Sequence, residues 1–340
     1  MIREEITSSS DVYSRIFGDP YLSVFESALS EKFEKTGILI SSPEFFLDAF
    51  KVLGVGYGDE VILPALCQRE NVRAIRKIGG SPVFVDIRLS DYAIDSDRIE
   101  EAITDRTKLI LISHLFGNPA IDTEKILRIA KKNSLKVLEN ISGAFGAKLL
   151  IDGRWRNVGT LGDIGYFNFS QVFSGKSLLM SGMICEKEDR IYEQLYGACV
   201  TRGRNNLSFG ELTRVGRKCA RAEQDREQRR FIITRYESAL GGVSEINLQR
   251  ISGGGRSAFT RYIFRTTKKE EIERLLVNLD LRYANLKRFF LPSYRNGYLS
   301  GSFPVAEQAV RESILLPVSG KYASKEAESI IEAVKLFMKN

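Results

Sequence analysis

The sequence is poor in the residues that build metal centres and disulfide frameworks. Its 340 residues include four cysteines and a single histidine, His114. No two cysteines stand in a Cys-x-x-Cys arrangement, so the spacing typical of structural zinc sites is missing. We therefore expect reduced, structural thiols and no metal site.

Long hydrophobic runs are missing as well. The longest apolar stretches, such as LILIS at 109–113, have the length of a strand and are too short to span a bilayer. The first residues, MIREEITSSS, contain no apolar segment of the kind found in signal peptides. We therefore expect a cytoplasmic protein that does not insert into a membrane.

Charge of both signs is abundant, with a moderate basic excess. The chain has 50 Lys and Arg residues against 43 Asp and Glu residues, a formal net charge of +7. The densest basic run, 213–230, is interrupted by Glu223, Asp225 and Glu227, as in a solvated helix face. Because none of the usual nucleic-acid-binding motifs is present, we expect no nucleic-acid partner. The basic excess leaves small anionic ligands open.

Strand-like and helix-like segments alternate over the first half of the chain. Short apolar runs predict strands, and helical spacing or a charged segment with a glycine stop predicts helices between them. The predicted strands are 37–41, 58–66, 81–87, 107–118, 135–140 and 164–169, and the predicted helices are 10–36, 42–54, 69–80, 95–104 and 122–133. This order predicts a three-layer α/β/α fold with a mostly parallel sheet. A ligand should then lie at the C-terminal ends of the strands, near Ser41, Pro64, His114, Asn140 and Phe169.

The pattern changes after about residue 190. A hairpin-like segment at 147–159 precedes the change, and a charged helical stretch runs to about 238. A strand at 258–266 and helices at 268–279 and 323–339 follow. We predict an N-terminal helical segment (1–35), a large domain (36–225) and a small C-terminal α+β domain (226–340).

Several segments resemble motifs of the DegT/DnrJ/EryC1/StrS family of sugar aminotransferases. They are GYGDEVILP at 56–64, the block 79–122, ILRIAKKNSLKVLEN at 126–140, GTLGDIGYFNF at 159–169 and FPVAEQAVRESILLPV at 303–318. The resemblance implies the aspartate-aminotransferase fold (fold type I), with pyridoxal phosphate (PLP) as cofactor. It also implies a homodimer in which both chains build the site.

Two of the cofactor positions that the resemblance implies lie early in the chain. The family's phosphate-binding helix start corresponds to Ser42, Pro43 and Glu44. Proline has no N–H to offer a phosphate, and Glu44 brings a negative charge to the place where a phosphate should lie. The position of the aromatic residue that stacks on the cofactor ring corresponds to Cys67 and Gln68.

The remaining implied positions are substituted too. Asn140 stands where the family has the aspartate that keeps the pyridine nitrogen protonated, and an amide cannot neutralise a pyridinium. Gly143 replaces the residue that meets the phenolic oxygen, Phe145 replaces a common histidine, and Asn168 stands at a serine that contacts the phosphate. These substitutions, beside intact scaffold motifs, indicate a cofactor site that no longer holds PLP in the usual way.

The lysine that would form the Schiff base is also displaced. In FNFSQVFSGKSLLMSG, 167–182, the family spacing places this lysine at Phe173, whereas Lys176 follows three residues later. A three-residue insertion at Ser170–Phe173 would restore Lys176 to the site. In the other interpretation, Lys176 is an ordinary loop lysine and Phe173 has replaced the catalyst.

Three hypotheses follow. The first, which we favour, is a divergent homologue with a degraded cofactor site, either non-catalytic and a possible partner of an active paralogue, or altered in activity. The second is an active aminotransferase that moves an amino group from glutamate to a keto-sugar on a nucleotide, with the Schiff base on Lys176. The third is different chemistry in the same cleft without PLP. Its titratable candidates have structural interpretations that we prefer: His114, Glu44, Glu139 and Asp163.

Overall fold

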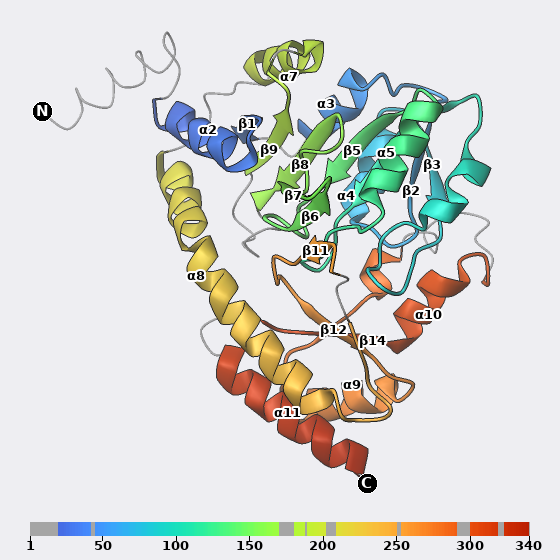
Figure 1. The fold of residues 1–340 in the computed structure, drawn as a ribbon, viewed down its shortest axis with the longest axis vertical. Helices are drawn as coiled ribbons and strands as arrows, with labels where there is room; N and C mark the ends of the chain where they lie inside the picture. The colour runs from blue at the N-terminus through green and yellow to red at the C-terminus, as the bar shows by residue number, and fades with distance from the viewer. Residues whose placement is uncertain are drawn as a thin grey trace, which may run out of the picture.

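The computed structural model describes residues 20–41, 45–169, 180–187, 189–201, 209–249, 253–290, 300–318 and 323–339. Its centre is a seven-stranded sheet with the strand order β1-β9-β8-β5-β4-β2-β3 (Figure 1). All neighbouring strands are parallel except β9, which runs antiparallel to both β1 and β8. The strands are β1 (Thr36–Ser41), β2 (Glu60–Pro64), β3 (Ser81–Val85), β4 (Thr107–Ser113), β5 (Lys136–Asn140), β8 (Ile164–Asn168) and β9 (Met180–Cys185). The predicted mostly parallel sheet is confirmed.

Helices cover both faces of this sheet because its strands are apolar on both sides. In β4, Leu109 and Leu111 pack in one core cluster, whereas Ile110 and Ile112 pack in another. The first cluster includes residues of α3 (Phe45–Val52), α4 (Arg69–Lys77) and α7 (Arg190–Thr201). Residues of α5 (Thr123–Lys132) join the second, and α2 (Pro20–Phe33) packs on the same side over β1 and β8. The three layers predicted from the sequence are therefore present.

The segment 95–104 differs from its prediction. We predicted one helix there, but the structure has two short 3-10 turns, η1 (Ser96–Arg98) and η2 (Glu100–Ala102). Side-chain bonding explains the difference: Asp95 accepts the backbone N–H of Asp97, and Ser96 donates to Asp122 at 2.6 Å. Short polar side chains that bond nearby backbone groups compete in this way with an α-helix.

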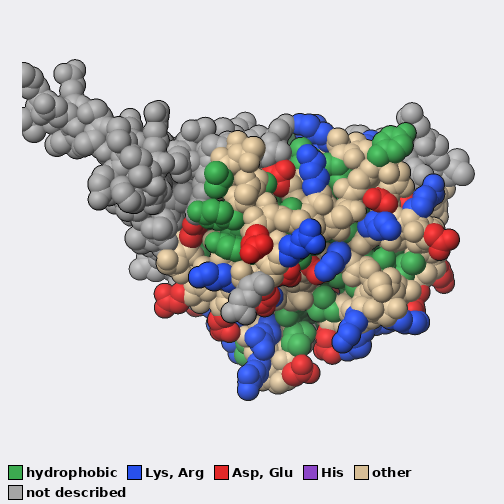
Figure 2. Space-filling view, turned by 90° about the horizontal axis from the view of Figure 1, so that it is seen from above, with side chains coloured by type: hydrophobic (Ala, Val, Ile, Leu, Met, Phe, Trp, Pro, Cys, Tyr) green, Lys and Arg blue, Asp and Glu red, His purple; other side chains and the backbone are tan. Residues whose placement is uncertain are grey.

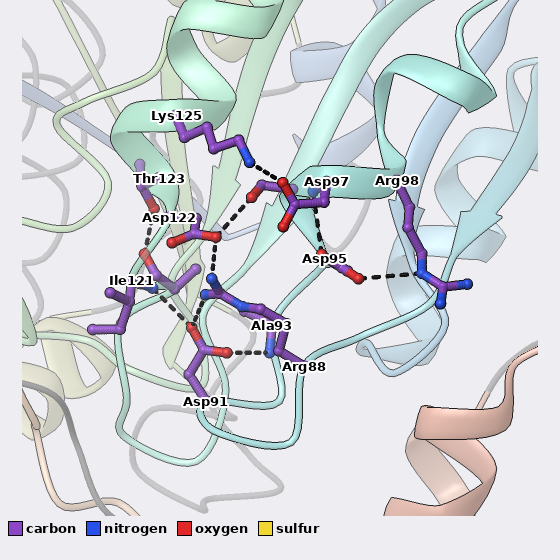
Figure 3. A network of polar contacts seen from close by, with 12 residues as sticks. Arg88, Asp91, Ala93, Asp95, Asp97, Arg98, Ile121, Asp122, Thr123 and Lys125 are labelled. Carbon is purple, nitrogen blue, oxygen red and sulfur yellow. Dashed lines mark hydrogen bonds and ion pairs between the residues drawn. The ribbon is translucent and has the colours of Figure 1, made fainter.

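Ion pairs fix the loop before these turns against the start of α5 (Figure 3). The guanidinium of Arg88 binds the carboxylates of Asp91 and Asp122, and Asp91 also accepts the backbone N–H of Ile121 at 2.9 Å. Lys125 pairs with Asp97, and Arg98 pairs with Asp95 at 3.2 Å. This network joins the crossover after β3 to the helix after β4.

A second sheet follows in the C-terminal part of the chain. Its four antiparallel strands have the order β10-β12-β14-β13, with bounds Asn247–Leu248, Tyr262–Arg265, Ser313–Leu316 and Ala284–Asn285. One face packs on α8 (Phe209–Leu240), α9 (Lys269–Asn278) and α11 (Ala323–Lys339). The other face contacts the C-terminal edge of the main sheet through Ile263 and Leu315, which cluster with Leu66 and Phe116. The predicted boundary at 225/226 falls inside α8, which runs along both parts (Figure 1), and that division stays a prediction.

A small third sheet contains the predicted hairpin. Strands β6 (Lys148–Ile151) and β7 (Arg154–Asn157) pair antiparallel, and β11 (Gly255–Arg256) adds to β6. The turn uses Asp152 and Gly153, both with positive φ, as a tight hairpin requires.

The surface agrees with the mixed charge of the sequence. In Figure 2, which looks onto the molecule from above the view of Figure 1, basic and acidic side chains are interspersed. Within the described ranges, no helix is both long enough and apolar enough to cross a bilayer.

Asp86 provides a specific link between the main sheet and helix α10 (Pro304–Glu312). Its buried carboxylate accepts the backbone N–H groups of Ala306 at 2.9 Å and Val305 at 3.0 Å, which are first-turn donors of α10. Helix N-termini need such acceptors because their first N–H groups have no partner within the helix.

We expect Asp86→Asn to lower the free energy of unfolding by about 1–2 kcal/mol. An asparagine keeps one acceptor oxygen but replaces the other with an N–H donor that would face the helix N–H. Urea denaturation measures the change. Asp105→Asn is the matched control, because Asp105 is exposed and its substitution removes the same charge. Equal stability of Asp86→Asn and wild type would contradict this function of Asp86.

Candidate functional site

The candidate site lies where strands β2, β4, β5 and β8 end at the same edge of the main sheet. The Asn140 Nδ2 donates to Asn71 Oδ1 at 2.7 Å, and Asn71 Nδ2 donates to Ser113 Oγ at 3.0 Å. A longer bond of 3.4 Å joins Asn71 Nδ2 to Gln68 Oε1. We call these four buried residues, Gln68, Asn71, Ser113 and Asn140, the amide cluster.

The amide cluster is made entirely of uncharged side chains. The other end of the Asn140 amide is also engaged, since Oδ1 accepts the backbone N–H of Ser142 at 3.0 Å. Asn71 also bonds the thiol of Cys67, but burial is the larger effect and raises the pKa of that thiol well above its ordinary value. Burial therefore favours the protonated form of the Cys67 thiol. The cluster offers neutral donors and acceptors, with no carboxylate of its own.

Gly143 lies beside this cluster in a space that excludes a side chain. A Cβ atom there would lie 2.7 Å from the carbonyl oxygen of His114 and 3.4 Å from Gln68 Nε2. The Gly143 carbonyl accepts two bonds of 2.8 Å, from the Gly117 N–H and the Thr260 hydroxyl. Gln68 Nε2 itself is buried and has no hydrogen-bond partner among the described residues. The donor amide of Gln68 therefore lies beside Gly143.

Asn168 ends β8 on the other side of Asn140. Its backbone N–H donates to Ser142 Oγ at 3.0 Å, and its Nδ2 donates to Ser181 Oγ at 3.3 Å. The Tyr166 hydroxyl also contacts Ser181 Oγ, at 3.2 Å, and burial raises the pKa of Tyr166 to about 12. Tyr166 therefore stays protonated at neutral pH and offers no base.

His114 and Glu139 form a buried pair with a structural role. The Ala120 N–H donates to His114 Nδ1 at 3.0 Å, so the ring proton is on Nε2 and points at Glu139 Oε2, 3.0 Å away. Glu139 also accepts the N–H groups of Gly159, Leu161 and Gly162 at 2.7–2.9 Å. Its carboxylate thereby organises the loop before β8.

Asp163, another candidate acid, also forms bonds to neighbouring groups of the fold. Asp163 pairs with Lys136 at 2.7 Å and accepts the Val137 N–H at 2.8 Å, at the opposite end of β5 from Asn140. The structural interpretation of His114, Glu139 and Asp163 agrees with these bonds.

The predicted site residues divide into two groups. Gln68, Asn140, Gly143 and Asn168 come together at one edge of the sheet, and Phe145 packs against Phe33, Phe167 and Phe169. The second group lies outside the described residues, so the structure tests none of its contacts. It contains Ser42, Pro43, Glu44, Phe173 and Lys176. Their predicted roles stay predictions.

The sequence analysis missed Asn71 and Ser113. Asn71 precedes Val72 and stands four residues before Ile75, so it lies on the buried face of α4. A polar residue on the apolar face of a predicted helix was the available signal. Ser113 ends β4 next to His114, and only its pairing with Asn140 across the sheet gives it a place in the site.

The described residues contain no group of three or more His, Cys, Asp or Glu side chains that could hold a metal ion. What the site offers chemically is hydrogen bonding by amides, hydroxyls and backbone groups. A ring nitrogen without a proton fits such a site, because Asn140 has an N–H to donate. Asn140 itself offers a pyridinium no carboxylate, because its side chain is a neutral amide.

Comparisons with known proteins agree with the fold and the motifs. The model of the DegT/DnrJ/EryC1/StrS aminotransferase family matches residues 16–207 and 215–335. A dTDP-3-amino-3,6-dideoxy-alpha-D-galactopyranose transaminase of Aneurinibacillus thermoaerophilus is 30% identical over 300 residues, 83% of this chain and 80% of that protein. A pleiotropic regulatory protein of Geobacillus stearothermophilus is 28% identical over 311 residues, 86% of this chain and 82% of that protein.

A solved structure shares the same fold. The PLP form of the putative sugar aminotransferase Spr1654 from Streptococcus pneumoniae superposes with a TM-score of 0.83 at 21% identity. The match covers 94% of this chain and 91% of that one. From its sequence and its fold, this chain belongs to the DegT/DnrJ/EryC1/StrS aminotransferase family.

Proposed function

We propose that this chain is a divergent sugar-aminotransferase homologue that does not carry out standard transamination and is non-catalytic or altered in activity. The observation that carries the proposal is the state of Asn140. Both ends of its side-chain amide bond other groups of a buried, uncharged cluster. The position from which a carboxylate would stabilise a pyridinium therefore holds a neutral amide.

The physical argument concerns the proton on the ring nitrogen. PLP, when bound to an aminotransferase, supplies an electron sink whose strength depends on a protonated pyridine ring. A buried cation without a compensating charge is costly, so the amide cluster favours the unprotonated, weaker form. The residues that would hold the cofactor here are Asn140 at the ring nitrogen, Gln68 beside the ring, and Ser42 and Asn168 on the phosphate.

A non-catalytic member of this family would act through its partners. Family dimers build the site from both chains, so we propose a cytoplasmic homodimer or a heteromer with an active paralogue. The name of one relative, a pleiotropic regulatory protein, supports such a role. A nucleotide-linked sugar in the cleft is compatible with this function, because binding a sugar does not need PLP.

A second candidate is an active aminotransferase that uses Lys176 as the Schiff base, with glutamate as amino donor and a keto-sugar as acceptor. The name of the transaminase relative from Aneurinibacillus favours it.

Absorption spectra with added PLP test the proposal. We expect the wild-type protein to show no lysine-dependent visible band and no spectral change with glutamate. A band that Lys176→Ala abolishes, with a response to glutamate, would establish the second candidate instead. Lys187→Ala is the control, because Lys187 follows β9 at the opposite edge of the sheet.

The variant Asn140→Asp sharpens the test. A carboxylate at this position should stabilise the pyridinium by about 1–3 pKa units, the usual effect of a close opposite charge. We expect Asn140→Asp to bind PLP more tightly than wild type, as measured by quenching of protein fluorescence. Equal affinity of the two proteins would mean that Asn140 is not the residue facing the ring nitrogen.

A further inference from the structure

Helix α11 lies at the end of the molecule away from the main sheet (Figure 1). Its inner face, with Ala327, Ile330 and Val334, is buried in the core of the C-terminal part. Its outer face includes Leu336, which is 67% exposed. A single exposed apolar residue is common on a protein surface, whereas a group of them marks an interaction site. The neighbours of Leu336 therefore decide what its exposure means.

Two grooves follow α11, one on each side. The α8 groove lies between α8 and α11, and its lining includes Ile331 and Phe231, which is 60% exposed. The α9 groove, of about 350 Å³, lies between α11 and the turn after α9. Its lining includes Leu336, Ala333 and Leu279, which is 50% exposed. Three strongly exposed apolar residues thus lie along one helix, as in an interaction site.

The ridge of α11 between these grooves carries one charge of each sign that has no ion-pair partner among the described residues. The two residues are Glu332, which lines the α9 groove, and Lys335, which lines the α8 groove, and both are exposed. Glu328 on the same ridge differs, because Arg235 pairs with it at 2.6 Å. A surface with an acid and a base close together along a helix can complement a second copy of itself.

An antiparallel pair of α11 helices matches these charges. When Glu332 of one copy lies opposite Lys335 of the other, two-fold symmetry sets the same two residues opposite each other a second time. A parallel pair would instead set like charges against each other. In the antiparallel pair the same side of both helices meets, because the axis crosses them. Leu336 of each copy then faces the α9 groove of the other, between Ser329 and Ala333.

We propose that α11 packs antiparallel against α11 of a second copy of this chain, with Leu336 in the α9 groove and Glu332 paired with Lys335 of the other copy. Burial of apolar surface stabilises the contact, and the charge pairs set its register. A contact of one helix from each copy is small, as is typical of weak and transient association. It lies apart from the amide cluster, so it can join homodimers of the kind proposed above and depends neither on PLP nor on Asn140.

Sedimentation velocity over a range of protein concentrations tests the contact. At high concentration, we expect the largest species of wild type to have twice the mass of that of Leu336→Gln. The substitution should weaken the association by about tenfold to hundredfold, the usual effect of no longer burying one leucine. Because Leu336 is exposed within one copy, the variant should keep the melting temperature of wild type within about 2 °C.

Charge reversal tests the antiparallel register. Glu332→Lys and Lys335→Glu should each weaken the association by about tenfold, because each places two pairs of like charges in the contact. The double variant restores both pairs with their signs exchanged, so it should associate about as well as wild type. Glu101→Lys is the control, because Glu101 is exposed on η2, and it should leave the association unchanged.

A disulfide probe identifies this contact independently of any other interface. In the proposed register, the two copies of residue 332 lie about 4.5 Å apart along the helices, within reach of a bridge. Under mild oxidation, Glu332→Cys should give disulfide-linked dimers, and Glu101→Cys should not. The proposal is overturned if Leu336→Gln associates as strongly as wild type, if the double charge variant associates no better than the single reversals, or if Glu332→Cys links no more than Glu101→Cys.

Discussion

The variant Glu139→Ala should lower the free energy of unfolding by about 3–5 kcal/mol. Glu139 is fully buried and accepts four hydrogen bonds, from His114 and from the N–H groups of Gly159, Leu161 and Gly162. Alanine leaves all four donors without an acceptor in a site that water does not reach. Each buried donor that is left unpaired costs about 1–3 kcal/mol before relaxation.

Glutamine at position 139 cannot replace the carboxylate fully. Its single oxygen can accept from Leu161 and Gly162, but its N–H₂ would then face two other donors, His114 Nε2–H and the Gly159 N–H. The ring cannot reverse its tautomer without facing the N–H of Ala120. We therefore expect Glu139→Gln to lie between wild type and Glu139→Ala. Urea unfolding measures the series, with the exposed Glu193→Ala as a control expected to change stability by less than about 0.5 kcal/mol.

The pH dependence of this contribution has a defined sign. Burial by itself would raise the pKa of Glu139, but the bonds from His114 and from the backbone N–H groups of Gly159 and Gly162 lower it below its usual value. The unfolded chain, with a glutamate pKa of about 4.3, therefore takes up the proton first as the pH falls. The contribution is complete above that pH and is lost as the pH falls through the lower pKa of the folded state. Wild type should thus lose more stability than Glu139→Gln between about pH 5 and pH 3. Parallel curves for the two proteins would show that Glu139 is not the titrating group.

The variant Gly165→Ala should destabilise the protein by about 3 kcal/mol or more. A Cβ atom on Gly165 would lie 2.1 Å from the Gly159 carbonyl oxygen and 2.8 Å from the Gly159 Cα. These are backbone atoms, so no side-chain rotation relieves the contact. Strand β8 also cannot shift, because it is hydrogen-bonded to β5 on one side and β9 on the other.

The control for this variant is Gly197→Ala. Gly197 lies within α7, and a Cβ atom there would have no neighbour within 4 Å. Alanine favours a helix over glycine, so we expect this control to raise stability by up to about 1 kcal/mol. Soluble yield, circular dichroism and urea unfolding compare the two variants. A stable Gly165→Ala protein would mean that the loop 157–163 can move away from β8.

The positions of the strands and helices show how much of the secondary structure local sequence patterns predict. The apolar runs at 37–41, 81–87 and 135–140 predicted strands that the structure confirms, because short runs of apolar and β-branched residues favour strands. The prediction of a single helix at 95–104 was wrong, because the charged and apolar residues of this segment fit one helix as well as two 3-10 turns. Side-chain bonds to Asp122, which is distant in sequence, favour the turns.

The sequence by itself determined the family, the mostly parallel sheet and the neutral residue at position 140, because motifs and apolar periodicity are local properties of the chain. Only the tertiary structure decided which residues surround Asn140. Asn71 meets it across 69 residues, and Thr260 meets Gly143 across 117. Such contacts depend on the order of strands in the sheet and on how the second sheet packs against its edge. For the same reason, the sequence alone did not show that Arg265 pairs with Glu312, because folding brings β12 and α10 together.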